Sequence, residues 1–414
     1  MASLQPVRGT QDLLPAEQSR HRRVIETARA IAARYGYEEI ATPIFEFTEV
    51  FSRPIGETTD IVVKEMYTFR DRSGDEITLR PEYTAGIVRA IISNGLTQNL
   101  PLKFFASGPM FRHERPQKGR FRQFHQIDLE LIGVPQPQAD VEVIEAGAEI
   151  LDALGILPRT VLELNTLGDT ASRRAYRAAL VDYFGKYRSE LSEDSQRRLE
   201  VNPLRILDSK EEHDRRVSQG APSFDQYLND ESRKFFSGVR AGLDRLGIRY
   251  ELSPRLVRGL DYYCHTAFEF VTEHLGSQGT VMGGGRYDGL MALMGGPDTP
   301  GVGWAAGIER LAMLIAEPPA EPRPIAVIPV GEKGEAEAPR IARELRRAGF
   351  HVELGYSGNV GRRMKRANKI NARVAVILGE DELSRHTATL RDLDAGTQSE
   401  VPLPELAERL APFR

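Results

Sequence analysis

A proline-rich segment constrains the folding of this chain more than any other stretch. Residues 316–324, AEPPAEPRP, hold four prolines in nine positions. Proline can continue neither a helix interior nor a central strand. A chain of 414 residues is long enough for two or three domains, so we interpret this segment as a linker. It separates residues 1–317 from a C-terminal domain over residues 318–414.

The region beyond the linker has a simple alternating pattern. The strand-like segments IAVIPV, HVELGY and ARVAVIL alternate with the helix-like segments EAEAPRIARELRRAG and VGRRMKRANKI. This order predicts a small α/β domain with a largely parallel sheet. Arg323 to Arg414 contain 16 basic and 13 acidic residues, a net charge of +3. The whole chain carries −4, so the remainder carries −7 and the C-terminal domain is locally basic.

The region before the linker has a mixed pattern with one helical interruption. Residues 172–253 are polar with a helical period, and we interpret them as a helical insertion into one sheet domain formed by residues 1–171 and 254–317. The other expected helices cover residues 16–35, 85–95 and about 304–316. The expected strands cover residues 102–112, 122–132, 262–271 and 278–284.

Composition excludes several classes of protein. Hydrophobic residues make up 41% and charged residues 28%, which excludes collagen-like, disordered and coiled-coil chains. The net charge argues against a generally basic nucleic-acid coat but leaves local binding patches possible. The single cysteine, Cys264, allows neither an intrachain disulfide nor a cysteine zinc cage. With no secretion signal and no apolar run near the ~20 residues of a membrane span, we expect a soluble, cytoplasmic protein.

The familiar nucleotide-binding and metal-binding motifs are missing from the sequence. It contains no GxxxxGK[ST] and no HExxH, and the glycine-rich segments at 283–289 and 301–307 do not fit GxGxxG. Cys264 and His265 are neighbours on an expected strand, so their side chains would point to opposite faces and would not share a metal. Nucleotide chemistry in this chain would have to come from side chains arranged on a sheet.

A basic loop lies between two of the expected strands. The segment RHERPQKGRFR, residues 112–122, has one acid, Glu114, and the basic residues Arg112, Arg115, Lys118, Arg120 and Arg122. Most charge runs of this kind are solvated surface. Pro116 and Gly119 indicate a loop held between strands, which is a common position for binding groups. The planar guanidinium fork matches phosphate or carboxylate.

The strand after this loop has two faces of different character. By alternation, Ile127, Leu129 and Leu131 share one face, which suits a core. The other face carries Gln126, Asp128 and Glu130. On the strand alone, a water-exposed face is the simpler interpretation. The neighbouring basic loop favours the alternative, a pocket wall for a polar, cationic group.

Two later segments carry further candidate residues. In RGLDYYCHTAFEF, residues 258–270, Arg258 precedes an expected strand that begins with Tyr262 and Tyr263. Such residues are ordinarily a surface arginine and packed tyrosines. The three glycines 283–285 indicate a bulge, a hairpin turn or close approach of a ligand. Arg310 follows a glycine-rich segment, and an ordinary helical arginine is the simpler interpretation there.

Taken together, these segments resemble the class II histidyl-tRNA synthetases. The strings VRGTQDLLP, LRPEYTAG, FRHERPQKGRFRQFH, LVRGLDYYCHTAFEF, GGGRYDGL and GVGWAAGIERL are similar to signatures of that family and stand in the family's order along the whole chain. One residue departs from the pattern, because Tyr83 stands where the family usually has glycine. Glu82 and Thr84 remain in register, and the sequence leaves open whether Tyr83 changes the local shape.

The resemblance implies a fold and a partner. It implies an α+β catalytic core with an antiparallel sheet flanked by helices, a helical insertion, and a C-terminal anticodon-binding α/β domain. It also implies a homodimer built in part by residues 38–52.

The resemblance further implies a reaction and roles for individual residues. L-histidine and ATP would give histidyl-adenylate and pyrophosphate, and the histidyl group would pass to the 3′ end of tRNA(His). Catalysis and ATP binding would use Arg112 and Arg258, with Arg310 at the γ-phosphate and Mg²⁺ on the pyrophosphate oxygens. The residues implied in histidine binding are Glu82, Thr84, Gln126, Glu130, Tyr262 and Tyr263. Contact with the tRNA acceptor end would come from Arg115, Gln117, Lys118 and Arg120. No protein ligand for the metal is assigned.

Two other functions remain open at this stage. Paralogues of these synthetases serve as histidine-binding regulatory subunits of ATP phosphoribosyltransferase and do not charge tRNA. They typically lack the C-terminal domain and the basic loop, both of which this chain has. A plain RNA-binding module would leave Arg258 and Arg310 unexplained. The basic helix segment 362–369 fits either an RNA contact or a solvated helix face.

Overall fold

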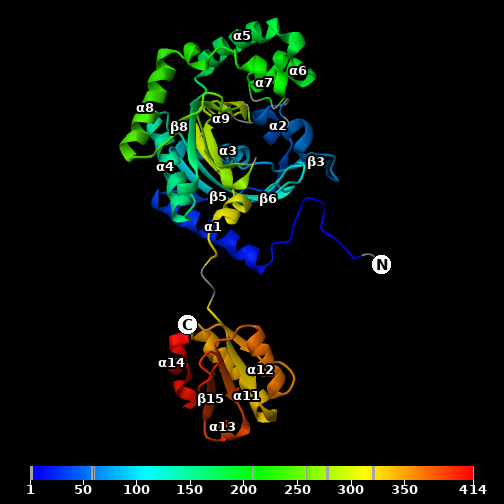
Figure 1. Cartoon of the computed structure of the whole chain (residues 1–414), viewed down its shortest axis with the longest axis vertical. Coiled ribbons are helices and arrows are strands. Elements are labelled where there is room, and N and C mark those ends of the chain that lie inside the picture. Colours follow the sequence, from blue (N-terminus) through cyan, green and yellow to red (C-terminus); the bar gives the residue numbers. More distant parts are fainter. Residues whose placement is uncertain are drawn as a thin grey trace. The chain divides into compact units, whose positions relative to one another are not determined.

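The computed structural model describes residues 3–56, 59, 61–207, 209, 211–257, 260, 262–276, 279–318 and 322–413. The chain divides into two compact units, Met1–Pro318 and Pro319–Arg414 (Figure 1). Each unit has its own sheet and its own hydrophobic core. No helix among the described residues is long and apolar enough to cross a bilayer.

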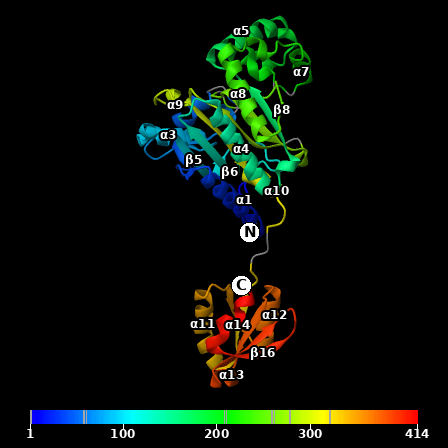
Figure 2. The ribbon, with the colours of Figure 1, turned by 90° about the vertical axis from the view of Figure 1, so that its left-hand side faces the viewer.

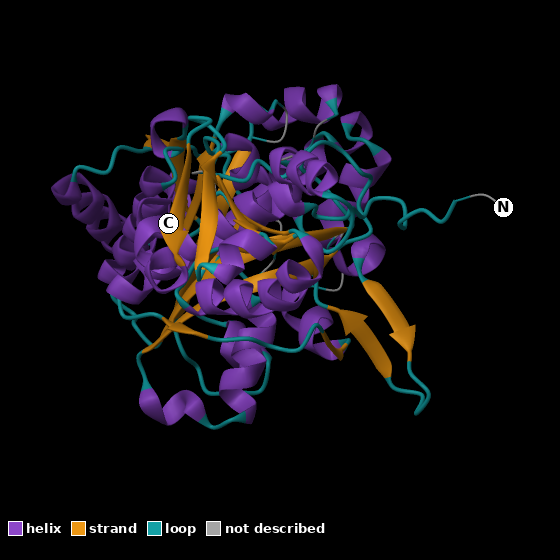
Figure 3. Ribbon diagram, turned by 90° about the horizontal axis from the view of Figure 1, so that it is seen from below, coloured by secondary structure: helices purple, strands orange, loops and turns teal. Residues whose placement is uncertain are grey.

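An eight-stranded sheet forms the centre of the first unit. In spatial order its strands are β1 (Glu38–Glu39), β5 (Leu102–Phe111), β6 (Gln123–Ile132), β11 (Gly301–Gly307), β10 (Thr280–Arg286), β9 (Cys264–Val271), β7 (Val161–Thr166) and β8 (Glu251–Leu252). All neighbours from β5 to β7 pair antiparallel. The edge strands β1 and β8 pair parallel with their neighbours. Figure 3 distinguishes these strands from the helices around them. The predicted antiparallel sheet flanked by helices is confirmed.

Helices cover both faces of this sheet. One face packs against α1 (Pro15–Arg34), α4 (Pro137–Ala153), α8 (Asp230–Leu246) and α10 (Ile308–Leu314) (Figure 2). The other face packs against α2 (Glu49–Ile55), α3 (Thr84–Ser93) and α9 (Leu290–Leu293). Ile127, Leu129 and Leu131 of β6 belong to the first core, as their alternation predicted. The polar face of β6 is therefore turned toward α3.

The long segment between β7 and β9 contains helices of two kinds. Helices α5 (Thr170–Lys186), α6 (Glu193–Val201) and α7 (Glu212–Ser218) lie together at one end of the unit (Figures 1 and 2). They share a small separate core that includes Leu180 and Phe184. In contrast, α8 contributes Val239 and Leu243 to the main core. This last helix of the segment is therefore packed on the central sheet.

The structure corrects the expected helix at about 304–316. Residues 301–307 form strand β11 between β6 and β10, and the helix begins only at Ile308. The small residues of GVGWAAG let neighbouring backbones approach on both sides, and tertiary pairing overrides the local propensity. The three glycines 283–285 likewise lie inside β10 and do not form a turn.

A small three-stranded sheet completes the first unit, and a mixed sheet forms the second. The small sheet has the order β2 (Phe45–Phe47), β4 (Glu76–Leu79), β3 (Tyr67–Arg70). The second unit has the order β13 (Val352–Leu354), β12 (Ile325–Pro329), β14 (Val374–Leu378), β15 (Thr387–Asp392), β16 (Gln398–Pro402), with β15 and β16 antiparallel. Its helices are α11 (Gly331–Arg347), α12 (Val360–Lys369), α13 (Glu380–Ser384) and α14 (Leu406–Leu410).

A buried ion pair joins helix α4 to strand β10. Arg286 and Asp140 are both fully buried, and the Arg286 Nε lies 3.0 Å from Asp140 Oδ2. The same guanidinium donates to the carbonyl of Val134 at 3.0 Å. Because the charged groups are paired and hydrogen-bonded, their attraction offsets the desolvation cost of burying them in the core. Three residues further along α4, the carbonyl of Val143 accepts a hydrogen bond from Trp304 Nε1 at 2.9 Å.

Removing the charge of Asp140 should destabilise the first unit strongly. Asp140→Asn leaves Arg286 with only the partly exposed Asp288 as counter-ion, and loss of one partner of a buried pair costs about 3–5 kcal/mol. Trp304 is the single tryptophan of the sequence, so its fluorescence during denaturant unfolding reports on this unit alone. Glu49→Gln, which removes the exposed pair with Arg53, is the control and should cost less than about 1 kcal/mol. Equal small effects of both substitutions would contradict this role for the pair.

Candidate active site

A cavity of about 430 Å³ opens over the glycine-rich strands on the α3 face of the sheet. Its wall includes most of the residues that the sequence singled out, although they are far apart along the chain. The predicted residues on this wall are Glu82, Thr84, Arg112, Arg120, Gln126, Tyr262, Tyr263 and Arg310. Arg258 lies outside the described residues.

Glu130 lies deep beside this cavity and is held from two sides. Its carboxylate accepts a hydrogen bond from Thr84 Oγ1 at 2.6 Å and another from the hydroxyl of Tyr287. Burial raises the pKa of Glu130 to about 8, even though both hydrogen bonds favour the charged form. Among the described residues, the cavity wall includes Gln126 and Asp128 of the same strand but not Glu130.

Glu82 closes the start of helix α3. Its two carboxylate oxygens accept hydrogen bonds from the backbone N–H groups of Thr84 at 2.7 Å and Ala85 at 2.9 Å. These N–H groups have no partner inside the helix, so a carboxylate here stabilises the first turn. Burial nevertheless raises the pKa of Glu82. The segment thus places one carboxylate and one hydroxyl, from Glu82 and Thr84, on the cavity wall.

Tyr83, the departure from the family pattern, points away from the cavity. Its ring packs 4.1 Å from the guanidinium carbon of Arg80, and its hydroxyl donates to the carbonyl of Ser107 at 2.9 Å. Residue 108 is glycine, and a Cβ there would lie 2.7 Å from the Tyr83 hydroxyl oxygen. Glycine at 108 therefore provides the room for tyrosine at 83, and Glu82 and Thr84 still reach the cavity.

Arginines also line the cavity. Arg112 follows β5 and donates from Nε to the carbonyl of Pro81 at 2.9 Å, with its guanidinium 5.2 Å from the ring centre of Phe124. Arg310 on α10 donates to the carbonyl of Thr280 at 2.5 Å. Burial, together with the charge of Arg120, lowers the pKa of Arg310. Three cations in one cavity favour an anionic ligand of high charge, such as a polyphosphate.

The four loop residues predicted to touch an acceptor stem differ in position. Arg115, Gln117 and Lys118 are exposed. Arg120 lies on the cavity wall and forms an ion pair with Glu114 at 2.9 Å. Gln117 and Arg120 also close a tight backbone turn. The loop therefore has one side turned toward the cavity and one side turned toward solvent.

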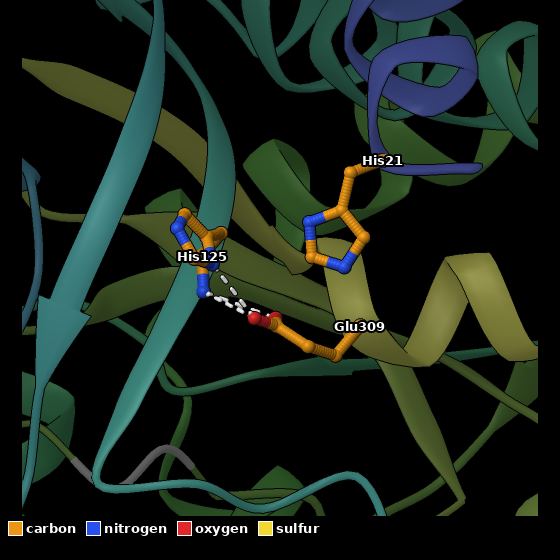
Figure 4. A group of neighbouring side chains, drawn as sticks. All are labelled: His21, His125 and Glu309. Carbon is orange, nitrogen blue, oxygen red and sulfur yellow. Dashed lines mark hydrogen bonds and ion pairs between the residues drawn. The ribbon is translucent and has the colours of Figure 1, made fainter. Parts of the chain in front are cut away.

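Figure 4 shows a cluster of three side chains, His21 of α1, His125 of β6 and Glu309 of α10, of which Glu309 lines the cavity. Both carboxylate oxygens of Glu309 accept from the backbone N–H of His125 at 3.0 Å, and His125 Nδ1 lies 2.8 Å from Glu309 Oε1. The His21 ring packs edge-on against His125, with ring centres 5.4 Å apart. One ligand atom from each residue lies within 4.8 Å of the others, close enough to consider a metal. The Glu309 carboxylate already contacts the backbone N–H and the ring of His125. These contacts fix the start of β6 on α10.

Sequence reasoning missed several residues of this site. Glu114, Glu269 and Glu309 line the cavity, and Tyr287 holds Glu130. Asp128 was placed on the correct face of its strand without a role. The alternation of side chains along β6 predicted its polar face. No local pattern indicates that Tyr287, just after the glycines of β10, reaches across the sheet to β6.

The raised pKa of Glu130 gives a testable pH dependence. The folded chain keeps this proton up to about pH 8, whereas the unfolded chain releases it near the ordinary value of 4.5. The unfolded state therefore binds fewer protons in between, and stability falls as the pH rises from about 5 to about 8. Glu130→Gln should lack this loss of stability. The unfolding free energy of the variant minus that of the wild type should therefore increase across this window by a few kcal/mol, on the order expected for such a shift.

Denaturation followed by Trp304 fluorescence at several pH values measures this difference. Glu26→Gln, an exposed position on α1, is the control and should give a difference that does not change with pH. A Glu130→Gln difference that stays constant from pH 5 to pH 8 would show that the carboxyl group is ionised in the folded chain.

The chain was compared with families of known proteins. The sequence profile described as "Histidyl-tRNA synthetase" matches residues 9–179 and 188–311. A second profile, described as "Anticodon binding domain", matches residues 324–411. The histidine–tRNA ligase of Rhodospirillum rubrum is 62% identical over 414 residues and covers 100% of both chains. That of Gluconacetobacter diazotrophicus is 56% identical over 411 residues and covers 99% of both chains.

Solved structures give the same result. The apo histidyl-tRNA synthetase of S. aureus has a TM-score of 0.84 at 34% identity and covers 98% of this chain and 99% of its own. A Bacillus halodurans protein titled "ATP phosphoribosyltransferase regulatory subunit/histidyl-tRNA synthetase" shares the fold, with a TM-score of 0.67 at 21% identity over 92% of this chain and 99% of its own. The class II fold predicted from the sequence is confirmed, and the chain belongs to the histidyl-tRNA synthetase family.

Proposed function

We propose that this chain is a histidine–tRNA ligase, which activates L-histidine with ATP and transfers the histidyl group to the 3′ end of tRNA(His). One observation carries the proposal. A single cavity is lined by both carboxylates and arginines, in a chain that is 62% identical over its full length to a curated ligase of that name. Carboxylates suit a cationic amino acid, and arginines suit a polyphosphate.

The carboxylates near β6 and α3 are proposed to bind histidine. Glu82, Thr84 and Gln126 would receive the α-ammonium group, while Glu130 and Tyr263 would select the imidazole and Tyr262 would line the pocket. A buried carboxylate and a phenol can each form a hydrogen bond with one ring nitrogen. A site that leaves such groups unpaired with other ligands discriminates by about 10⁴–10⁵, which makes editing unnecessary.

The arginines of the cavity are proposed to bind ATP. The histidine carboxylate attacks the α-phosphorus in line and displaces pyrophosphate, a step that needs positioning and charge neutralisation. Arg112 would hold the α-phosphate and the attacking carboxylate, and Arg310 the γ-phosphate. Arg258 would neutralise the α-phosphate from the other side.

Mg²⁺ is proposed to bind together with ATP. Hard carboxylate oxygens suit this ion, which is usually bound through one or two carboxylates plus substrate phosphates. Glu114 and Glu269 line the same cavity as the arginines and would hold it there. The ion would neutralise charge on the pyrophosphate oxygens.

The remaining parts of the chain are proposed to serve tRNA. The catalytic domain would comprise residues 1–171 and 254–317, the helical insertion 172–253 and the anticodon-binding domain 318–414. On α12, Arg362, Lys365, Arg366 and Lys369 are exposed, while Arg363 is buried and pairs with Glu335 at 2.6 Å. A basic helix face of this kind suits a phosphate backbone. The tRNA substrate implies that the chain works in the cytoplasm.

A homodimer is also proposed, and exposed apolar side chains support it. Phe45 and Phe47 of β2 are each 58% exposed, and Phe69 of β3 is 48% exposed. Clusters of large apolar side chains on a surface commonly mark a protein interface. Sedimentation of the purified chain tests this proposal, and a monomer at micromolar concentration would contradict it.

The alternative function is a histidine-binding regulatory subunit of ATP phosphoribosyltransferase. The relatives of high identity bear the ligase name, and residues 324–411 match the anticodon-binding profile. Both findings favour the ligase. The basic loop between β5 and β6 also supports it, because a subunit that binds only histidine has no use for it.

Amino-acid-dependent ATP–pyrophosphate exchange tests the function directly. We expect the purified chain to exchange pyrophosphate with histidine alone among the twenty amino acids and to stop when the metal is chelated. No exchange, with histidine still bound in calorimetry, would favour the regulatory subunit. Exchange with another amino acid would contradict the proposed specificity.

The exposed side of the basic loop gives a separate prediction about tRNA. Lys118→Ala should lower kcat/KM for tRNA charging about tenfold, the effect of one lost charge-assisted hydrogen bond, and leave pyrophosphate exchange unchanged. Arg23→Ala, an exposed position on α1, is the control and should change neither rate. Equal losses in charging and exchange would place Lys118 in the adenylation step instead.

A further inference from the structure

Asp128 is the most unusual acidic residue of the cavity. It lies on β6 between Gln126 and Glu130 and is 1% exposed, yet its carboxylate faces the cavity. Among the described residues, neither of its oxygens has a hydrogen-bond partner. A buried polar atom without a partner costs about 1–3 kcal/mol, and more when it is charged. Such an arrangement persists where a ligand supplies the missing partner.

A second unpartnered acceptor lies two residues away on the same face. Gln126 Oε1 is buried and also has no partner among the described residues. In a strand, side chains at alternate positions share a face, so both acceptors line the same wall. Two adjacent buried acceptors require a ligand group that is rich in N–H donors. An alkylammonium group supplies three N–H donors and a positive charge.

Two other carboxylates near Asp128, those of Glu82 and Glu130, already have hydrogen-bond donors. Glu82 accepts two backbone N–H groups of α3, and Glu130 accepts Thr84 and Tyr287. Glu130 and Glu82 both act on the Asp128 carboxyl group and, with burial, raise its pKa well above the usual range. Arg80 and Arg112 oppose this shift only in part. Of these three carboxyl groups, that of Asp128 is the one whose oxygens have no hydrogen-bond partner among the described residues.

We propose that Asp128 is a further substrate-binding residue, which accepts a hydrogen bond from the α-ammonium group of the amino acid beside Gln126. The inference rests on the proposed function. It assigns the imidazole to Glu130, which lies beside the cavity, and the ammonium group to the cavity wall. The ammonium charge would be met by Asp128 and Glu82 together, and the substrate carboxylate would be left free to turn toward Arg112.

Asp128→Asn tests this assignment, because it keeps the shape of the side chain and removes its charge. Calorimetry on the full chain should show histidine and histidinol, which both carry the amino group, binding roughly tenfold to a hundredfold more weakly, as for a lost charged hydrogen bond. The KM for ATP in pyrophosphate exchange should change less than about twofold. Imidazolepropionate, which lacks the amino group, should inhibit exchange no less well than it inhibits the wild type.

Asp214→Asn is the matched control, since Asp214 is a fully buried aspartate of the helical segment. Its carboxylate accepts from Ser192 and Ser195 at 2.7 and 2.6 Å, so the substitution should lower the thermal midpoint and leave histidine binding unchanged. Asp128→Asn should have a midpoint at or above that of the wild type, because it removes an unpartnered buried acid.

The outcomes separate the inference from the function on which it rests. Unchanged histidine binding by Asp128→Asn would overturn the inference. So would a parallel loss for histidine and imidazolepropionate, or a parallel loss for histidine and ATP with a lower midpoint. If the wild-type chain neither binds histidine nor exchanges pyrophosphate with it, the proposed function itself fails, whatever the variant does.

Discussion

The close approach of strand β11 to Glu130 is the constraint on which the site depends. Gly303 pairs with Glu130 across the two strands, and a Cβ at residue 303 would overlap with the Glu130 carboxylate. Gly284 of β10 is similarly closed off by the backbone of β11. Only glycine lets these strands lie together with a glutamate side chain between them. The glycine-rich strings are therefore a requirement of packing as much as of ligand access.

This packing explains how one cavity can hold opposite charges. Burial raises the pKa of the carboxyl groups of Glu82, Asp128 and Glu130, which lie on β6 and just before α3. The arginines come from the loop after β5 and from α10. The His125–Glu309 contact fixes α10, which carries Arg310, against β6. Fixed positions of the binding groups are what in-line attack on a phosphate requires.

The sequence predicted this arrangement in part, and the reason differs from residue to residue. Alternation along β6 correctly separated Ile127, Leu129 and Leu131 from the polar face, because strand geometry is local. The strand at 301–307 was wrongly expected to begin a helix, since its conformation comes from pairing with β6 and β10. The contact of Tyr287 with Glu130 could not be predicted, because it joins the end of β10 to β6. These two strands lie on either side of β11 in the sheet. The burial that leaves Asp128 without a partner is likewise a property of the assembled sheet.

The most direct test of this account is a crystal structure of the chain with a non-hydrolysable histidyl-adenylate analogue. The account predicts the imidazole beside Glu130 and Tyr263, the α-amino nitrogen within hydrogen-bond distance of Asp128 and Gln126, and the phosphate-like group at Arg112. An analogue bound with its imidazole toward the arginines, or outside the cavity over β10 and β11, would contradict it.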